Sequence, residues 1–377
     1  MSLTILLVFV AIALVSEYIN GFHDTANSIA TVVATKVLSP GQAVLLAAAT
    51  NLAGALAGTA VAQTIAVGLI NTNLVEITAG VLICALVAGI VWNLVTWWVG
   101  LPSSSSHALI GGLIGAAIGA AHGNFNVLIW SKPADPWYKG AGLLWKIVIP
   151  MVTSPIAGFF LAMAIMSVLF AIISSMNGRS GWLGRISRPR WVNALFGKAQ
   201  LGSAAYMGFA HGLNDAQKTM GIIALAFATA TAAGQLHDLP GWLQFVRIEE
   251  DANGKFGIPI WIKFMCAIVM AAGTAAGGWR IIKTLGHKMV KLHPIDGFAA
   301  EMSSATILSV AASMGMPIST THSISTAIMG VGVVKNPRAL RWPVVERIIW
   351  AWVLTLPATG GLAYLLVSAL VALDLVR

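Results

Sequence analysis

The chain has 377 residues, of which 58% are hydrophobic and only 9% are charged, whereas a soluble protein carries about 25% charged residues. This composition excludes a soluble enzyme. It predicts an all-α polytopic membrane protein, because apolar runs of about 20 residues or more recur along the chain. The net charge is +9, but the basic residues gather in short loops, where they set membrane topology. We therefore expect membrane lipid around the chain and no nucleic acid as a partner.

The apolar stretches fall at 3–35, 43–70, 77–99, 101–122, 142–176, 200–233, 258–280, 297–334 and 348–376. Several exceed one membrane span, which predicts broken helices or hairpins that enter the membrane and turn back. We expect the breaks at the polar runs 20–28, 102–107, 211–219 and 317–322. The whole chain then has about 10–12 membrane segments, and each hairpin segment is left open as crossing or re-entrant.

Loop charges predict the orientation. Segments 177–199, 280–293 and 335–347 hold most of the 22 basic residues, so we place them in the cytoplasm. Segment 235–257 holds several acidic residues and is expected outside, as are both termini. This divides the chain into an N-terminal membrane repeat (1–176), a basic cytoplasmic linker (177–199) and a C-terminal membrane repeat (200–377) that contains the external acidic loop.

Two motif pairs indicate an internal repeat. Segment 21–27 (GFHDTAN) matches 212–218 (GLNDAQK), and 100–107 (GLPSSSSH) matches 315–322 (GMPISTTH). The second pair is more widely separated than the first, by about the length of the acidic segment, so the halves align once that segment is removed. Because the first half begins outside and the second inside, the repeats are predicted to have inverted topology.

Asp24 and Asp215 occupy equivalent positions deep in apolar sequence. A carboxylate at membrane depth costs about 2.5–3.5 kcal/mol on insertion scales, so it is kept where it faces a cavity, binds an ion or makes a structural helix contact. Residues three positions apart share one helical face. The pairs Asp24/Asn27 and Asp215/Lys218 are therefore expected to present two polar groups each to one point.

The hydroxyl-rich motifs predict a different kind of element. A proline after glycine ends a helix, and the following Ser or Thr residues begin a new one. Free N–H groups and the positive end of the helix dipole bind anions. The two motifs together would form a cup of N–H and O–H donors suited to a small tetrahedral oxyanion, although the hydroxyls could instead only cap buried hairpins. The candidate donors are Ser104, Ser105, Ser106, Ser319, Thr320 and Thr321.

Lys218 breaks the symmetry, since its repeat partner is Asn27. A lysine in the membrane must be paired or lie near an anion. It could pair with Asp215, contact substrate or replace a bound cation. Glu17 and Glu301 are candidate proton carriers, Glu17 because it lies seven residues before Asp24 on roughly the same helical face.

Other chemistries are not expected. The eight histidines show no convincing ligand spacing, and Cys84 and Cys266 lie in apolar runs without metal-type spacing, so no metal site and no cofactor are predicted. A nucleophile elbow is absent from the sequence. The chain is therefore not expected to be an enzyme.

These motifs resemble the paired signatures of the PiT family of inorganic phosphate transporters, and the resemblance runs from Glu17 to about Gly332. It implies symport of phosphate by two inverted repeats, with a midplane site between broken helices and hairpins. By position, the family's phosphate and ion motifs match Asp24, Asn27, Asp215, Ser104, Ser105, Ser106, Ser319, Thr320 and Thr321. Glu301 in segment 297–301 (GFAAE) matches the family's acidic residue after Gly-Phe.

Two positions depart from the sodium-coupled pattern of that family. His23 and Lys218 stand where it has asparagine, which removes amide oxygens that could ligate Na⁺. The lysine form resembles the bacterial proton-coupled branch, in which a neutral complex of a divalent metal with phosphate is an alternative transported species. The resemblance thus implies a proton-coupled phosphate importer in the cell inner membrane. A homodimer is left open.

Three alternatives remain at this point. The coupling ion could be Na⁺ instead of H⁺, the substrate could be sulfate or arsenate, or the chain could be a passive anion channel. A channel would conduct without saturation at modest concentrations and would not accumulate phosphate against a gradient.

Overall fold

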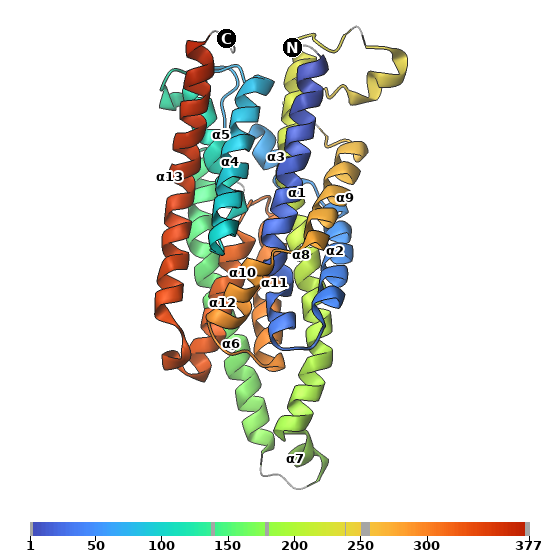
Figure 1. Ribbon diagram of the computed structural model, residues 1–377, viewed down its shortest axis with the longest axis vertical. Coiled ribbons are helices and arrows are strands. Elements are labelled where there is room, and N and C mark those ends of the chain that lie inside the picture. The colour runs from blue at the N-terminus through green and yellow to red at the C-terminus, as the bar shows by residue number, and fades with distance from the viewer. Residues whose placement is uncertain (1–2, 137–139, 178–180, 238, 250–256, 374–377) are drawn as a thin grey trace.

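A computed structural model describes residues 3–136, 140–177, 181–237, 239–249 and 257–373. These residues form a bundle of helices (Figure 1) and contain no β-strand, only the isolated bridges Ile70–Leu128 and Lys132–Ala141. The all-α prediction is therefore confirmed.

The first half of the chain contains six longer helices. They are α1 (Leu3–Ala34), α2 (Pro40–Leu56), α3 (Ala60–Val67), α4 (Ala79–Val99), α5 (Ser105–Ala120) and α6 (Ile149–Met176), with the short turns η1 (Phe125–Val127) and η3 (Leu144–Val148) before α6. Helix α7 (Trp182–Ile186) follows at the lower end of Figure 1.

The second half repeats this order. It comprises α8 (Pro189–Ala232), η4 (Gly241–Val246), α9 (Ile260–Ala276), α10 (Trp279–Lys283), η5 (Thr284–Lys288), α11 (Pro294–Ser313), α12 (Thr320–Lys335), η6 (Pro337–Ala339) and α13 (Trp342–Ala372). Each half has one bent pair, with 68° between α2 and α3 and 58° between α9 and the segment 279–288. Helices α1 and α8 run in opposite directions in Figure 1.

The halves also exchange contacts. Helix α1 packs on α9 and α8 packs on α2, while α5 packs on α13 and α12 packs on α6. In each of these four pairs, a helix of the first half packs against a helix of the second half. Two inverted repeats would produce this arrangement, and the inversion itself stays a prediction.

Four helical segments are long and apolar enough to cross a membrane, namely Thr4–Ala34, Ala79–Val99, Leu144–Met176 and Trp342–Ala372. The two bent pairs raise the number to six. This agrees with the predicted multi-pass membrane protein. The larger count of about 10–12 segments, which included hairpins, stays a prediction.

Two of the four predicted helix breaks were wrong. Residues 20–28 lie inside the continuous helix α1, and 211–219 lie inside the continuous helix α8. Neither run contains proline, and their polar side chains bond mostly to other helices rather than to their own backbone. A polar run with outside partners does not interrupt helical hydrogen bonding.

The other two breaks are confirmed. Helix α4 ends at Gly100 and α11 ends just before Gly315, and both glycines have left-handed backbone angles, with φ of 71° and 64°. Glycine ends helices in this way without steric cost. Proline follows two residues later in both motifs, and Ser104 and Ser319 then cap new helices.

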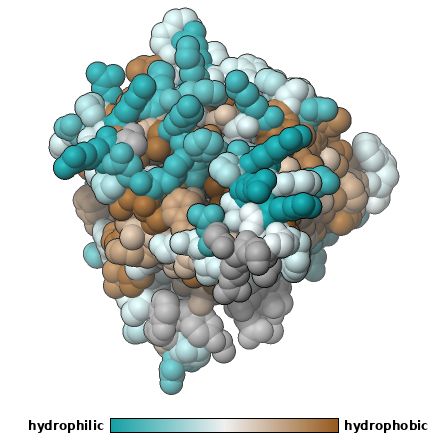
Figure 2. Space-filling view, turned by 90° about the horizontal axis from the view of Figure 1, so that it is seen from below, coloured by the Kyte–Doolittle hydropathy of each residue, from teal (hydrophilic) through white to brown (hydrophobic). Residues whose placement is uncertain are grey.

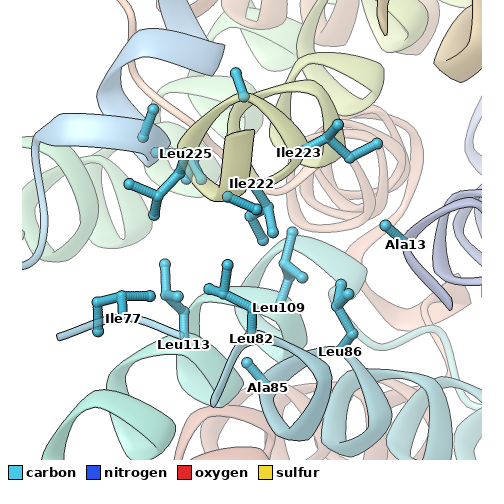
Figure 3. Packing of buried hydrophobic residues seen from close by; sticks show 14 of the residues in the cluster. Ala13, Ile77, Leu82, Ala85, Leu86, Leu109, Leu113, Ile222, Ile223 and Leu225 are labelled. Carbon is cyan, nitrogen blue, oxygen red and sulfur yellow. The ribbon is translucent and has the colours of Figure 1, made fainter. Parts of the chain in front are cut away.

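The buried apolar residues form two clusters, and each cluster contains residues of both halves. Figure 3 shows Leu82 of α4 and Leu109 and Leu113 of α5 directed toward Ile222 and Leu225 of α8. Small residues bring backbones close elsewhere. A Cβ on Gly212 of α8 would lie 2.1 Å from the Asn51 carbonyl oxygen of α2, so the crossing of these helices depends on glycine.

The two ends of the molecule differ. Helix α1 begins and α13 ends at the upper end in Figure 1, whereas α7 lies at the lower end. Figure 2 looks at the lower end and shows hydrophilic side chains gathered over it. Helix α7, the start of α8 and η6, which belong to the basic segments, lie toward this end. Residues 238 and 250–256 of the acidic loop lie outside the described residues, and the side of the membrane that each end faces stays a prediction.

Candidate functional site

The four motifs converge at one place inside the bundle. Helices α1 and α8 supply the two aspartates, and the N-termini of α5 and α12 supply the hydroxyls. All ten predicted substrate residues are buried, namely Asp24, Asn27, Ser104, Ser105, Ser106, Asp215, Lys218, Ser319, Thr320 and Thr321. The structure therefore brings the predicted residues together into one cluster.

Asp24 is bound by both hairpins. Ser105 of α5 donates to its Oδ2, and Thr321 of α12 lies 3.5 Å from its Oδ1. The ring of His23 lies 2.7 Å from the same Oδ1, and its other nitrogen is 3.1 Å from the Thr96 hydroxyl of α4. His23 thus links the carboxylate to α4.

Asp215 has a similar set of partners. Thr320 donates to its Oδ2 at 3.0 Å, and the Nε2 atom of His211 lies 3.0 Å from the same oxygen. The ammonium of Lys218 binds its Oδ1. Asp215 therefore has a lysine partner within its own helix, whereas the partner of Asp24 within α1 is the imidazole of His23.

Lys218 connects the two hairpins. Its ammonium donates to Ser106 of α5 and to Asp215, and to the Ile318 carbonyl before α12 at 3.2 Å. These three bonds use all three of its donors. The repeat partner Asn27 donates to Thr320 and Thr321 at 3.0 and 2.9 Å, so it contacts only the second hairpin.

Ser104 and Ser319 act as helix caps. The Ser104 hydroxyl accepts from the His107 N–H at 3.1 Å, and the Ser319 hydroxyl accepts from the His322 N–H at 3.2 Å. Their side chains therefore face their own helices, as one of the two sequence hypotheses expected. The first-turn N–H groups of a helix have no intrahelical acceptor, so α5 and α12 still offer backbone donors here.

Of the two predicted proton carriers, Glu17 borders this cluster and Glu301 has a separate set of partners. Thr219, next to Lys218, donates to Glu17 at 2.5 Å, and Glu17 is fully buried. Glu301 lies among other residues, accepting from Thr31, from Gln200 at 3.0 Å and from Ser203. None of these three belongs to the four motifs.

Sequence reasoning missed the side chains that hold the hairpins. The indole of Trp352 donates to the Pro102 carbonyl at 3.1 Å, and Lys146 donates to the Met314 carbonyl at 2.9 Å. The lone basic residue near the start of the apolar stretch 142–176 was a usable signal for Lys146. Nothing in the sequence marks Trp352 among 14 tryptophans.

A cation could bind within the same cluster. One ligand atom each of Asp24, His211 and Asp215 lies within 4.8 Å of the others, the one such group found in the described residues. Sequence reasoning had named Asp24 and Asp215 as candidate ion-binding residues, but it missed His211. The ammonium of Lys218 already contacts Asp215 and would compete with such an ion.

The arrangement combines donors with acids among buried side chains. Two helix N-termini, several hydroxyls and an ammonium supply positive potential, while two carboxylates supply acceptors. A small pocket between α1, α4, α5 and α8 reaches this cluster, with Asn20, Asn93, Ser106 and Lys218 in its wall. Such a site suits a small oxyanion that carries a hydrogen-bonding proton.

Fold and site together define a polytopic membrane protein with a buried cluster of polar and charged side chains. Residues 20–363 match the family described as "Phosphate transporter family". The chain therefore belongs to this family, as the sequence motifs indicated.

Two similar proteins carry the name of a phosphate transporter. The chain is 39% identical over 369 residues to the "Probable low-affinity inorganic phosphate transporter" of Bacillus subtilis (strain 168), covering 97% of both chains. It is 41% identical to a protein of the same name from Rhizobium meliloti (strain 1021), covering 96% of this chain and 93% of that one. The family and these relatives are transporters and not enzymes.

A solved structure shares the fold. The protein titled "The sodium-dependent phosphate transporter" matches with a TM-score of 0.77 and 22% identity over 100% of both chains. At this identity the match supports the fold alone.

Proposed function

We propose that this protein imports inorganic phosphate across the cell inner membrane by proton symport. The observation that carries the proposal is the position of Lys218, whose ammonium bonds Ser106 of one hairpin, the carbonyl before the other hairpin, and Asp215. A fixed positive charge thus lies between two helix N-termini, where an oxyanion is favoured.

Phosphate fits the mixture of donors and acids better than other oxyanions do. Ser105, Ser106, Thr320 and Thr321 offer hydroxyls, and Asp24 and Asp215 offer acceptors for a phosphate hydroxyl. Sulfate carries no proton at neutral pH, so its oxygens would face the carboxylates without a bridging hydrogen. Arsenate is nearly the same shape as phosphate and carries protons, so it should compete.

Proton coupling follows from electrostatics. A carboxylate beside a divalent anion is repulsive, and Asp24 has no cationic side chain of the kind that Lys218 provides for Asp215. Protonation of Asp24 would remove this repulsion and turn the carboxyl into a donor. Glu17, which accepts a hydrogen bond from Thr219 next to Lys218, and Glu301 are proposed as further proton carriers.

The transport cycle would rock one repeat against the other around this site. The opposite directions of α1 and α8 and the exchanged packing of α5 and α12 support this alternating-access mechanism. The basic lower end would face the cytoplasm and both termini the outside.

Sodium coupling is the second candidate. The grouping of Asp24, His211 and Asp215 favours it, because a cation there would also neutralise the carboxylates. The contact between Lys218 and Asp215 opposes it. The two proposals predict different driving gradients for the same substrate.

Competition in proteoliposomes tests the substrate. We expect uptake of labelled phosphate to saturate, to fall with excess arsenate and to persist with equal sulfate. Sulfate inhibition as strong as that by arsenate would contradict a protonated-oxyanion site. Uptake that rises linearly with phosphate and never exceeds the outside concentration would instead identify a channel.

A further inference from the structure

A second pocket opens on the membrane-facing surface, away from the buried cluster. It lies between the end of α4, η5 and the first turns of α13, and we call it the α4–α13 pocket. Its outer wall is apolar and accessible: Val95 is 51% exposed, Val99 63%, Trp350 56% and Leu354 49%.

Two exposed basic side chains complete the wall, Lys288 of η5 and Arg347 of α13. Among the described residues that line the pocket none is acidic. The pocket therefore joins a strip of aliphatic and aromatic surface to a pair of positive charges.

The depth of the pocket matches the edge of a bilayer. Helix α4 carries no charged residue over the span Ala79–Val99, and the span of α13 begins at Trp342. Exposed tryptophans mark this level, including Trp98 and Trp350, as is typical of membrane interfaces. The Arg280 guanidinium stacks on Trp98, 4.7 Å from the ring centre. We therefore expect the two pocket charges at the level of the lipid headgroups and the apolar wall at the level of the acyl chains.

We propose that the α4–α13 pocket binds an anionic phospholipid. Lys288 and Arg347 would hold the headgroup phosphate, and an acyl chain would lie along Val95, Val99 and Leu354. Basic pockets between membrane helices on the cytoplasmic side recognise such lipids. Free inorganic phosphate is also an anion, but it has no acyl chain to contact the apolar wall. The proposal does not depend on which substrate is transported.

The inner wall of the pocket borders the first hairpin. Thr284 of η5 donates to the Gly100 carbonyl at 2.8 Å, and Gly100 is the turn that leads to Ser104. Thr96, also in the wall, contacts His23 at 3.1 Å. A bound lipid would therefore support the segment that positions the hairpin, and we expect it to raise thermal stability.

Thermal unfolding of the purified protein in neutral detergent tests the proposal. Phosphatidylglycerol is expected to raise Tm by about 3–5 °C at saturation, while phosphatidylcholine and inorganic phosphate raise it much less. The double variant Lys288→Gln/Arg347→Gln should lose most of this shift. The matched control Lys291→Gln/Arg338→Gln removes the same charges from exposed positions outside the pocket and should keep it.

Three results would overturn the proposal. These are equal stabilisation by the two lipids, an unchanged shift in Lys288→Gln/Arg347→Gln, or a shift of equal size produced by inorganic phosphate through the same two residues. If that variant does not fold, Val99→Trp fills the apolar wall and leaves both charges in place. It should also remove the phosphatidylglycerol effect, and retention of the effect would count against the pocket.

Discussion

Lys218 determines the charge of the buried cluster more than any other residue. Its ammonium is shared by Ser106, Asp215 and the Ile318 carbonyl, whereas the equivalent Asn27 donates only to Thr320 and Thr321. The site is therefore electrically asymmetric although its backbone repeats. The Lys218 ammonium lies beside Asp215, whereas the side chain beside Asp24 is the imidazole of His23.

Replacing Lys218 by asparagine should weaken substrate binding. We expect Lys218→Asn to raise the half-saturating phosphate concentration for uptake at least about tenfold, the equivalent of 1.4 kcal/mol. It should also lower Tm, because the buried carboxylate of Asp215 would lose its ammonium partner. The double variant Asp215→Asn/Lys218→Asn should recover Tm without recovering uptake. Unchanged half-saturation in Lys218→Asn would exclude a direct role in binding.

Neutral replacements of Asp24 and Glu301 should impair transport in different ways. Asp24 bonds both hairpins, so Asp24→Asn should abolish or uncouple uptake while the protein still inserts and elutes as a single species.

Glu301 bonds Thr31, Gln200 and Ser203 outside the motifs. Glu301→Gln should therefore reduce proton-driven accumulation while exchange of labelled for unlabelled phosphate continues. Normal accumulation by either variant would remove that acid from the coupling mechanism.

Much of the residue-level site could be predicted, but its partners could not. The repeated motifs identified Asp24, Asp215 and the hydroxyls, because an acid in apolar sequence is rare. His211, Thr96, Trp352 and Lys146 act through contacts with residues distant in the sequence. Such contacts depend on helix packing, which no local spacing encodes.

At the scale of elements, the crossing of α2 and α8 also supports the site. Gly212 lies against the Asn51 backbone, and the Asn51 side chain lies 3.1 Å from His211, which in turn contacts Asp215. A side chain at position 212 would push apart the helix pair that orients His211.

Gly212→Ala should therefore destabilise the protein by about 1–3 kcal/mol, the usual cost of overpacking. Gly202→Ala is the matched control, since it lies in the same helix with no atom within 4 Å of the added Cβ. The control should be neutral or stabilising by about 0.5–1 kcal/mol, because alanine favours helix. Thermal unfolding in detergent measures both, and equal Tm values for the two variants would contradict the packing argument.

Element boundaries show where sequence reasoning succeeds and where it fails. The turns at Gly100 and Gly315 were predictable, because glycine followed by proline and a capping serine leaves few alternatives. The continuity of α1 and α8 could not be predicted, since residues 20–28 and 211–219 are as polar as a segment that interrupts a helix. Their side chains find partners on α4, α5 and α12, which only the assembled bundle reveals.

At the scale of the whole molecule, two similar halves enclose one polar centre. The order of the helices, the paired bends of 68° and 58° and the exchanged packing place both hairpins against opposite halves. A movement of one half would therefore change both hairpins at once. The basic lower end and the proposed lipid pocket lie on the same side of this centre.

The central claim is that a proton gradient drives phosphate through this centre. The most direct measurement follows labelled phosphate into liposomes that contain the purified protein, with an inward proton gradient in one batch and an inward sodium gradient at equal pH in the other. The account predicts accumulation above the outside concentration with the proton gradient only. Accumulation driven by sodium alone would contradict the role given to Lys218 and His23 and would favour a cation bound by Asp24, His211 and Asp215.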